Sequence, residues 1–174
     1  MLTVRPLPGL PPYGPPALAF PDADACREGF VVEFVTNNGK WVGNFRQGFT
    51  PERNSLHAEL GSRAVLVISG DAGYLVDAED RRLIRDLGCG IEGAWFIDDL
   101  GAMVISNGLW LEAFDADRVV WQSRRFSWDG LRNLSISGAV LTGEAIDPML
   151  NEWMPFTASL STGEVEGGSY NGPE

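Results

Sequence analysis

The sequence predicts an all-β fold, an antiparallel meander of consecutive hairpins with internal repeats. From Gly29 onward, short runs of β-branched and aromatic residues dominate, and such residues favour strands. Gly, Asn or Asp separates these runs, as tight turns between antiparallel strands require. Helix signals are almost absent, so we expect consecutive strands to pair with one another. A β-sandwich or an open barrel is the alternative arrangement.

The chain has 174 residues, of which 44% are hydrophobic, so the composition excludes a disordered chain. A domain of this size buries roughly 70% of the surface that its unfolded chain exposes. We expect two parts, a Pro-rich extended arm at 1–22 and a single all-β domain at 23–174. The arm holds most of the prolines, each of which removes a backbone donor. Tyr13, Leu18 and Phe20 give the arm apolar side chains with which to lie across the domain.

The first hairpin is predicted over residues 30–45. Alternating runs at 30–36 and 40–45 flank the sequence Asn-Asn-Gly. Asn and Gly tolerate the positive φ that two-residue hairpin turns demand, so this pattern is a strong hairpin signal. The following stretch, 50–61, begins with Thr-Pro-Glu, and we expect it to hold one short helical turn or a long loop.

Beyond this stretch the sequence predicts one strand after another, separated by turn residues. The expected strands are 64–69, 73–77, 82–86, 94–98, 102–106, 109–114, 118–123, 131–137, 140–146, 152–160 and 163–167.

The predicted strands contain an internal repeat. Two pairs of segments align at the same offset, 64–70 with 101–107 and 80–84 with 117–121. The acidic turns at 77–80 and 115–117 are then equivalent after a shift of one residue. A third, weaker copy begins at 134–138 and ends in the turn at 161–164. The period is a little shorter than the roughly 40–45 residues of a four-stranded propeller blade, so the repeats predict a propeller-like arrangement.

Residues 109–121 carry a resemblance to known repeats. They read Leu-Trp-Leu-Glu-Ala-Phe-Asp-Ala-Asp-Arg-Val-Val-Trp. An apolar strand that ends in an Asp-containing turn, before a strand closing on Trp, resembles the unit of quinoprotein-like and other propeller blades. The segment lacks the Gly that those repeats place in the turn. The resemblance implies blade-like repeats.

A second resemblance lies in the C-terminal third. Its residues are Ser-Trp-Asp-Gly-Leu at 127–131, Gly-Glu at 143–144, Trp153, Phe156, Thr-Gly-Glu-Val at 162–165 and Gly-Gly-Ser-Tyr at 167–170. This pattern is similar to the C-terminal signature of small uncharacterised bacterial all-β proteins. Some of those proteins accompany secreted toxins as immunity-type partners, so the resemblance implies an immunity-like context. It carries no catalytic position.

The chain is strongly acidic, with 13 basic residues against 24 acidic ones and a formal net charge of -11. Its arginines are scattered in ones and twos, so no basic patch predicts nucleic-acid binding. No apolar run approaches the ~20 residues that span a bilayer, so we expect no membrane contact. The N-terminal residues lack the continuous apolar stretch of a secretory signal, which favours a cytoplasmic protein.

No catalytic motif is evident. His57 is the only histidine, which argues against zinc catalysis and against a catalytic triad. Cys26 and Cys89 lack metal-binding or redox spacing and are expected to be reduced core or near-surface thiols. No Gly-rich nucleotide motif occurs. The sequence therefore predicts a protein that is not an enzyme and that binds no cofactor and no metal.

Carboxylates gather in the predicted turns. Five of them, Asp77, Glu79, Asp80, Asp115 and Asp117, fall in the equivalent turns of two repeats. Asp commonly caps such a turn with its own side chain. A calcium site would need a regular ligand spacing, which these turns lack. The functional alternative is an acidic binding rim, in which these five residues face a partner together.

The sequence contains six tryptophans, which are many for its length. Trp95, Trp110 and Trp121 fall in apolar strands, so we expect them to be buried in the core. Trp128 and Trp153 lie beside turn residues, so we expect them to be exposed. These two residues are candidates for contact with a partner or ligand.

Together these observations predict an acidic protein-binding domain, specifically an immunity-type inhibitor that occupies the basic active site of a toxin such as a nuclease. The net charge would speed encounter with a basic protein partner. One alternative is a carbohydrate- or small-ligand-binding β module, which the tryptophan content favours. Another alternative is a hydrolase on a β scaffold, which only the carboxylates support. The sequence leaves the oligomeric state open.

Overall fold

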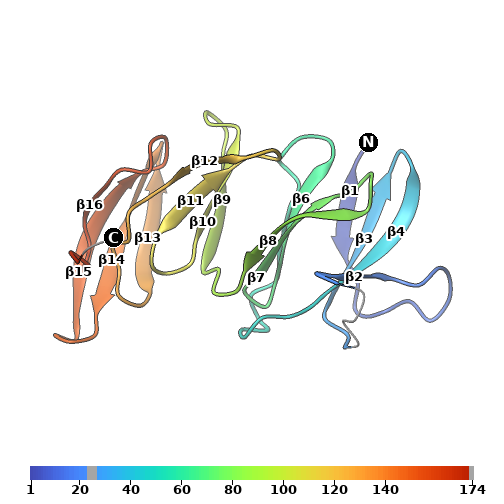
Figure 1. Cartoon of the computed structure of the whole chain (residues 1–174), viewed down its shortest axis with the longest axis horizontal. Coiled ribbons are helices and arrows are strands. Elements are labelled where there is room, and N and C mark those ends of the chain that lie inside the picture. The colour runs from blue at the N-terminus through green and yellow to red at the C-terminus, as the bar shows by residue number, and fades with distance from the viewer. Residues whose placement is uncertain (23–26, 173–174) are drawn as a thin grey trace. The chain divides into compact units, whose positions relative to one another are not determined.

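The computed structural model describes residues 1–22 and 27–172, which form four four-stranded β-sheets (Figure 1). The predicted all-β class is confirmed, and the sheets resemble propeller blades, since three of them are meanders of consecutive strands. All strand pairs are antiparallel except one, in which β2 runs parallel to β4. The chain divides into two compact units, Met1–Ile91 and Glu92–Glu174.

The strands have the following bounds: β1 Thr3–Pro6, β2 Leu18–Phe20, β3 Phe30–Thr36, β4 Gly39–Phe45, β5 Ser55–His57, β6 Ala64–Ser69, β7 Ala72–Asp77, β8 Arg82–Gly88, β9 Gly93–Ile97, β10 Ala102–Ser106, β11 Leu111–Phe114, β12 Val119–Gln122, β13 Leu131–Ser137, β14 Val140–Asp147, β15 Glu152–Ser159 and β16 Val165–Gly167.

The first sheet of the N-terminal unit has the strand order β1-β3-β4-β2. The predicted hairpin over residues 30–45 is present as β3 and β4. The Pro-rich arm supplies both edge strands, because β1 pairs with β3 and β2 pairs with β4. The Leu7 N–H donates to the Val31 carbonyl oxygen at 2.8 Å, so by strand alternation the preceding Pro6 nitrogen faces away from β3. A proline is tolerated on such an edge, where no donor is needed.

The second sheet of this unit has the order β5-β6-β7-β8. The prediction of a helical turn or a loop over residues 50–61 is wrong in part, because Ser55–His57 forms a strand that pairs with β6. Three residues are too few to show the alternation by which a strand is found in a sequence.

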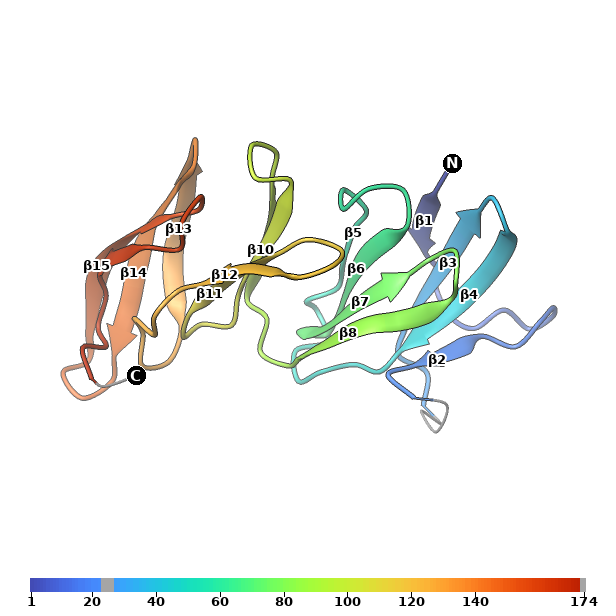
Figure 2. The same ribbon diagram turned by 45° about the horizontal axis from the view of Figure 1, so that its top comes forward.

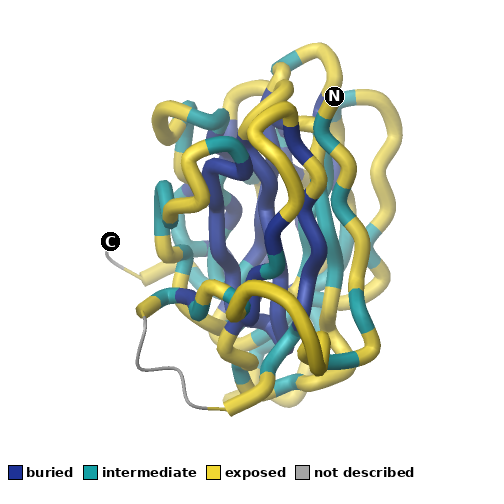
Figure 3. The backbone as a smooth tube through the Cα atoms, turned by 90° about the vertical axis from the view of Figure 1, so that its right-hand side faces the viewer, coloured by how far each residue is buried: buried dark blue, intermediate teal, exposed yellow. Residues whose placement is uncertain are grey.

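Aromatic residues fill the core of the N-terminal unit. The rings of Phe34 and Trp41 stack with their centroids 4.0 Å apart, and Phe20 stacks on Phe45 at 4.8 Å. Valines of β6 and β7 pack against this cluster and join the two sheets. In Figure 3 the interiors of the strands are buried, while most of the turns are exposed.

The C-terminal unit contains a third sheet of order β12-β11-β10-β9 and a fourth of order β13-β14-β15-β16 (Figure 2). Its core lies between the two sheets, where Val104 and Leu111 belong to the same buried cluster as Leu141 and Phe156. Phe126, in the connection between the sheets, contacts the Phe156 ring with a centroid distance of 4.7 Å.

The structure confirms the first internal repeat. Segments 64–70 and 101–107 fall on β6 and β10, each the second strand of its sheet. Segments 80–84 and 117–121 fall at the start of β8 and β12. The third copy is wrong at its beginning, because residues 134–138 lie at the end of β13, the first strand of its sheet. Its final turn, 161–164, does join the third and fourth strands, as the acidic turns do.

The predicted burial of Trp95, Trp110 and Trp121 is correct only in part, because all three are partly buried, and Trp95 and Trp121 pack against the core cluster of their unit. Trp95 lies in β9 and Trp121 in β12, which are the edge strands of the third sheet, and Trp110 precedes β11. An edge strand has a neighbouring strand on one side only, so its residues are covered less completely than those of β10 and β11. The most deeply buried tryptophan is Trp41, which is 6% exposed.

No helix in the described ranges is long and apolar enough to cross a membrane. Within the same ranges, no group of three or more His, Cys, Asp or Glu residues could hold a metal ion. Cys89 is exposed and forms no disulfide. The expectation for Cys26 lies outside the described residues.

Candidate functional site

Asp77, the last residue of β7, is buried with 4% of its surface exposed. Its Oδ1 accepts hydrogen bonds from the backbone N–H groups of Glu79 and Asp80, both at 3.0 Å. Its Oδ2 accepts a hydrogen bond from Arg63 Nη2 at 2.7 Å. Burial alone would raise the pKa of this carboxyl, but these hydrogen bonds outweigh burial and the pKa lies below its usual value. Asp77 is therefore ionised and holds the turn together.

The other carboxylates of this first acidic turn also have partners in their own unit. Arg63 Nη2 lies 2.6 Å from Asp80 Oδ2, and Arg82 approaches both aspartates. Glu79 accepts hydrogen bonds at 3.3 Å from two backbone N–H groups of the β3–β4 turn. Cations and backbone donors thus compensate much of the negative charge at this turn.

Asp115 repeats the geometry of Asp77 at the turn between β11 and β12. Its Oδ1 accepts hydrogen bonds from the backbone N–H groups of Asp117 and Arg118, both at 2.8 Å. The hydrogen bond from the Asp117 N–H is the main reason why the pKa of Asp115 is lowered. The side chain of Asp117 is exposed. The two acidic turns belong to different units, and their joint contact with one partner stays a prediction.

Trp128 is 37% exposed, and its ring meets that of Tyr170 edge-on with the centroids 4.7 Å apart. The Arg125 guanidinium lies 4.5 Å from the Tyr170 centroid and 5.5 Å from the Trp128 centroid. The backbone N–H of Trp128 donates a hydrogen bond to Ser169 Oγ at 3.3 Å. These residues come from the two ends of the C-terminal signature, which therefore contact each other directly.

Trp153 lies in β15 and is partly buried. The Arg132 guanidinium lies 4.1 Å from its ring centroid, and Arg132 Nε donates to Glu144 Oε2 at 2.9 Å. Trp153 is thus part of a cluster on the face of the fourth sheet that points away from the core, separate from the cluster of Trp128.

The acidic excess belongs mainly to the C-terminal unit. Residues 92–174 contain 13 acidic and 4 basic residues, a formal net charge of -9, whereas residues 1–91 contain 11 acidic and 9 basic residues, a net charge of -2. All four arginines of the C-terminal unit are engaged within it: Arg118 with Asp115, Arg124 and Arg125 with backbone carbonyl oxygens, and Arg132 with Glu144. Asp115 and Glu144 are thus carboxylates of this unit that each form an ion pair with one of its arginines.

A hollow of about 390 Å³ opens in this unit between the β9–β10 turn and the β13–β14 turn. Its lining includes the apolar side chains of Trp95, Phe96 and Ile136 and the acidic residues Asp98 and Asp99. Within the described part of the chain, no hydrogen bond or ion pair engages these two carboxylates. Apolar surface beside free carboxylates suits a lysine or arginine, whose stem is apolar and whose head is charged.

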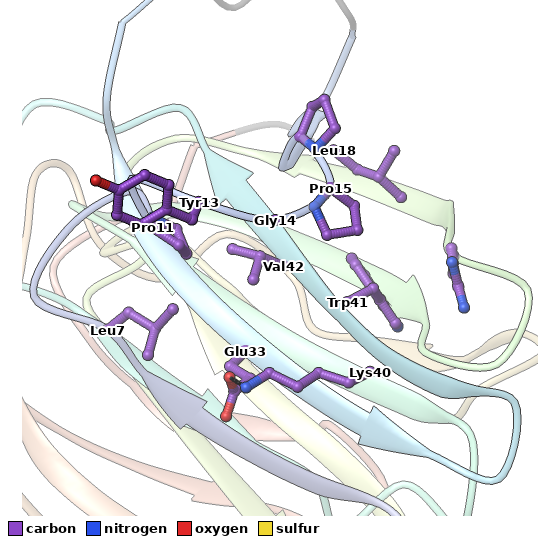
Figure 4. A pocket seen from close by; sticks show the side chains of 12 residues that line it. Leu7, Pro11, Tyr13, Gly14, Pro15, Leu18, Glu33, Lys40, Trp41 and Val42 are labelled. Carbon is purple, nitrogen blue, oxygen red and sulfur yellow. Dashed lines mark ion pairs between the residues drawn. The ribbon is translucent and has the colours of Figure 1, made fainter.

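A larger cavity of about 680 Å³ lies in the N-terminal unit, between the arm and the first sheet (Figure 4). Tyr13 and Pro15 of the arm cross above Val42 and Trp41 of β4, and the charged ends of Glu33 and Lys40 meet beside them. Sequence analysis missed this cavity. The apolar side chains of the arm were the available signal, but they do not reveal that the arm arches over the sheet instead of lying flat on it.

No protein-family model matches the chain, and no curated protein matches it. Similar solved structures include the WD40 β-propeller domain of Doa1, with 12% identity, a TM-score of 0.44 and coverage of 80% of this chain and 49% of that chain. Another is the eukaryotic initiation factor, with 11% identity, a TM-score of 0.41 and coverage of 82% of this chain and 40% of that chain. The chain therefore spans half or less of the length of these structures.

Proposed function

We propose that this chain is an acidic protein-binding domain for a basic protein partner, and that it acts as an immunity-type inhibitor of a toxin such as a nuclease. One observation carries the proposal. The C-terminal unit holds a formal charge of -9 out of the -11 of the whole chain. A surface of one sign attracts partners of the opposite sign and speeds their encounter.

The arginines of this unit leave its charge available to a partner. Arg124 Nη2 donates to the Gly167 carbonyl oxygen at 2.7 Å, and Arg125 Nε donates to the Ser127 carbonyl oxygen at 3.0 Å. These guanidinium groups are committed to backbone carbonyls, so they are poorly placed to neutralise the exposed carboxylates. Cations of a basic partner would supply the missing positive charge.

The hollow beside Asp98 and Asp99 offers an anchoring point for such a partner. Ile136, which contributes to its lining, is 38% exposed. An arginine or lysine stem placed against Ile136 and Trp95 would cover apolar surface while its head paired with a carboxylate. Charge-assisted hydrogen bonds of this kind are stronger than neutral ones. The exposed indole of Trp128 and the carboxylate of Asp117 are further candidates for the interface.

The C-terminal signature supports the same function, because it resembles that of small bacterial all-β proteins, some of which accompany secreted toxins. The signature residues around Trp128 and Tyr170 contact each other, which gives the two ends of the pattern a common structural role. These residues hold the C-terminal segment in place, and a binding domain needs such structural residues but no catalytic ones.

The test is to co-express the chain with the product of the gene directly upstream in its genome. We expect that product to be basic, to co-purify with the chain at equal stoichiometry and to lose its activity in the complex. The association rate should fall as salt rises from about 50 mM to 500 mM, since salt screens exposed charges. An upstream product that is acidic, or that stays active and unbound, contradicts the proposal.

Two double variants locate the interface. D98K/D99K and E52K/E59K change the net charge by the same amount, but the first alters the hollow and the second alters exposed residues of the N-terminal unit. We expect D98K/D99K to slow association strongly and E52K/E59K to slow it little. Equal slowing by both would exclude the hollow as the anchoring point.

A further inference from the structure

The cavity beneath the N-terminal arm is independent of the acidic surface and has its own chemistry. Its volume of about 680 Å³ falls within the roughly 300–1,000 Å³ of sites that bind small molecules. Leucines and prolines of the arm line it together with Tyr13 and with Val42 of β4. Tyr13 is 90% exposed and Leu18 is 40% exposed, so large apolar side chains at this cavity remain in contact with water. An apolar molecule in the cavity would cover them.

Three charged residues line the cavity, namely Glu33, Lys40 and Arg81. Glu33 forms ion pairs with Lys40 and with Arg5, so its charge is already compensated (Figure 4). Arg81 donates to the Asn38 carbonyl oxygen at 3.2 Å, and among the described residues no carboxylate forms an ion pair with it. The cavity therefore combines apolar walls with a guanidinium that lacks an anion.

The backbone at Arg81 also sets this residue apart. Arg81 ends the four-residue turn between β7 and β8 with a φ of 55°, a left-handed conformation that a long side chain adopts only under strain. Two other four-residue turns end in the same way, with Gly101 at a φ of 61° and Asn151 at a φ of 53°, the residue types that favour this conformation. Strained residues that persist against an easier alternative cluster at ligand-binding sites.

We propose that this cavity binds a small molecule with an apolar body and a single carboxylate, and that Arg81 receives the carboxylate. The apolar body would lie between the arm and Val42, where it would replace water at exposed apolar surface. The Arg81 guanidinium would donate charge-assisted hydrogen bonds to the carboxylate. Lys40, already paired with Glu33, would add positive charge nearby.

The experiment titrates the full chain with octanoate, octan-1-ol and octyltrimethylammonium, which share an apolar body and differ in charge. NMR shifts of the backbone amides of Gly14, Trp41 and Val42 report occupancy of the cavity. We expect saturable binding of octanoate at these amides, binding of octan-1-ol about tenfold weaker, and no binding of the cation. This tenfold difference in affinity corresponds to the loss of one charge-assisted hydrogen bond.

Four variants separate charge from shape. R81Q should weaken octanoate binding about tenfold and leave octan-1-ol binding unchanged. R53Q, which removes an arginine of the same unit that does not line the cavity, should change neither. V42W should weaken both ligands, because the larger side chain fills the cavity. R81G should weaken octanoate binding while raising the melting temperature, because glycine relieves the strained turn.

The proposal is overturned if octanoate and octan-1-ol bind equally, if R81Q and R53Q behave alike, or if octanoate shifts only amides outside the cavity. Absence of octanoate binding to the wild-type chain overturns it as well. None of these outcomes bears on the basic partner, because that proposal rests on the charge of the C-terminal unit and its test measures binding of a protein, not of octanoate.

Discussion

The indole Nε1 of Trp41 donates a hydrogen bond to the backbone carbonyl oxygen of Ala78 across 2.8 Å. This bond joins β4 of the first sheet to the turn that follows β7 in the second sheet. Trp41 also stacks on Phe34, so one side chain contributes both to the aromatic core and to the contact between two sheets.

Replacement of Trp41 should therefore lower the free energy of unfolding through two separable losses, that of the hydrogen bond and that of the ring. W41F keeps a ring against Phe34 but leaves the Ala78 carbonyl without its donor, and should cost about 1–3 kcal/mol of unfolding free energy. W41A also removes the ring and should cost about 3–5 kcal/mol. Urea denaturation measures both values. W128F, at an exposed indole, is the control, and a loss for W41F no larger than that of W128F would refute the role of the hydrogen bond.

Arg124 gives a second prediction, because its guanidinium covers the free edge of the last strand. It donates to the carbonyl oxygens of Val165, Gly167 and Tyr170 at 3.4, 2.7 and 3.1 Å. R124M should destabilise the fold by about 2–3 kcal/mol, since it leaves these acceptors without a charged donor. Hydrogen exchange should quicken at residues 165–170. R118M, which breaks only the exposed pair with Asp115, is the control, and equal exchange in the two variants would count against the prediction.

The strands that the sequence predicted are those with a complete signal of their own. Asn-Gly marked the first hairpin, and β6 and β10 were predicted from their β-branched apolar runs bounded by turn residues. β1, β2 and β5 have only three or four residues each, and the first two lie in a Pro-rich segment, so neither alternation nor composition identified them. Their formation depends on pairing with distant strands.

The candidate site was harder to predict, because side-chain partners are set by the tertiary fold. Asp77 and Asp98 look alike in the sequence as acidic turn residues. In the structure, Arg63 binds Asp77, whereas Asp98 lines a hollow beside Ile136 from a strand distant in the sequence. The path of the arm over Val42, which creates the larger cavity, likewise has no local signature.

Gly163 and Gly138 provide a third prediction, in which two glycines of similar conformation differ in their surroundings. Both have positive φ, 76° and 57°. A Cβ at Gly163 would come within 2.5 Å of the Trp121 ring, whereas a Cβ at Gly138 would meet nothing within 4 Å. G138A should cost about 1 kcal/mol through backbone strain alone. G163A should cost about 3 kcal/mol, because the clash adds to the strain.

Thermal denaturation of the two variants side by side decides this prediction. Near-ultraviolet circular dichroism should also change for G163A, since the Trp121 ring must move, and should stay constant for G138A. If the two variants lose the same stability, the contact between the β15–β16 turn and Trp121 is not tight in solution.

His57 leads to a prediction about pH. It lies in β5, partly buried, with its Nε2 3.0 Å from Ser55 Oγ. Burial lowers its pKa below the usual value, although the nearby Glu59 carboxylate acts in the opposite direction. The unfolded chain therefore binds a proton at a higher pH than the folded chain does. Unfolding free energy should fall as the pH drops through the ordinary histidine pKa of about 6.5, and should stop falling below the lowered pKa of the folded state.

A comparison of the wild type with H57Q isolates this contribution, because His57 is the only histidine. Urea denaturation at pH values from about 8 to 5 should give two curves that converge as the pH falls, since only the wild type loses stability by protonation of residue 57. The convergence should persist in high salt, because its main cause is burial and not an exposed charge. Parallel curves would show that His57 titrates alike in the folded and unfolded chain, and would place its imidazole in contact with water.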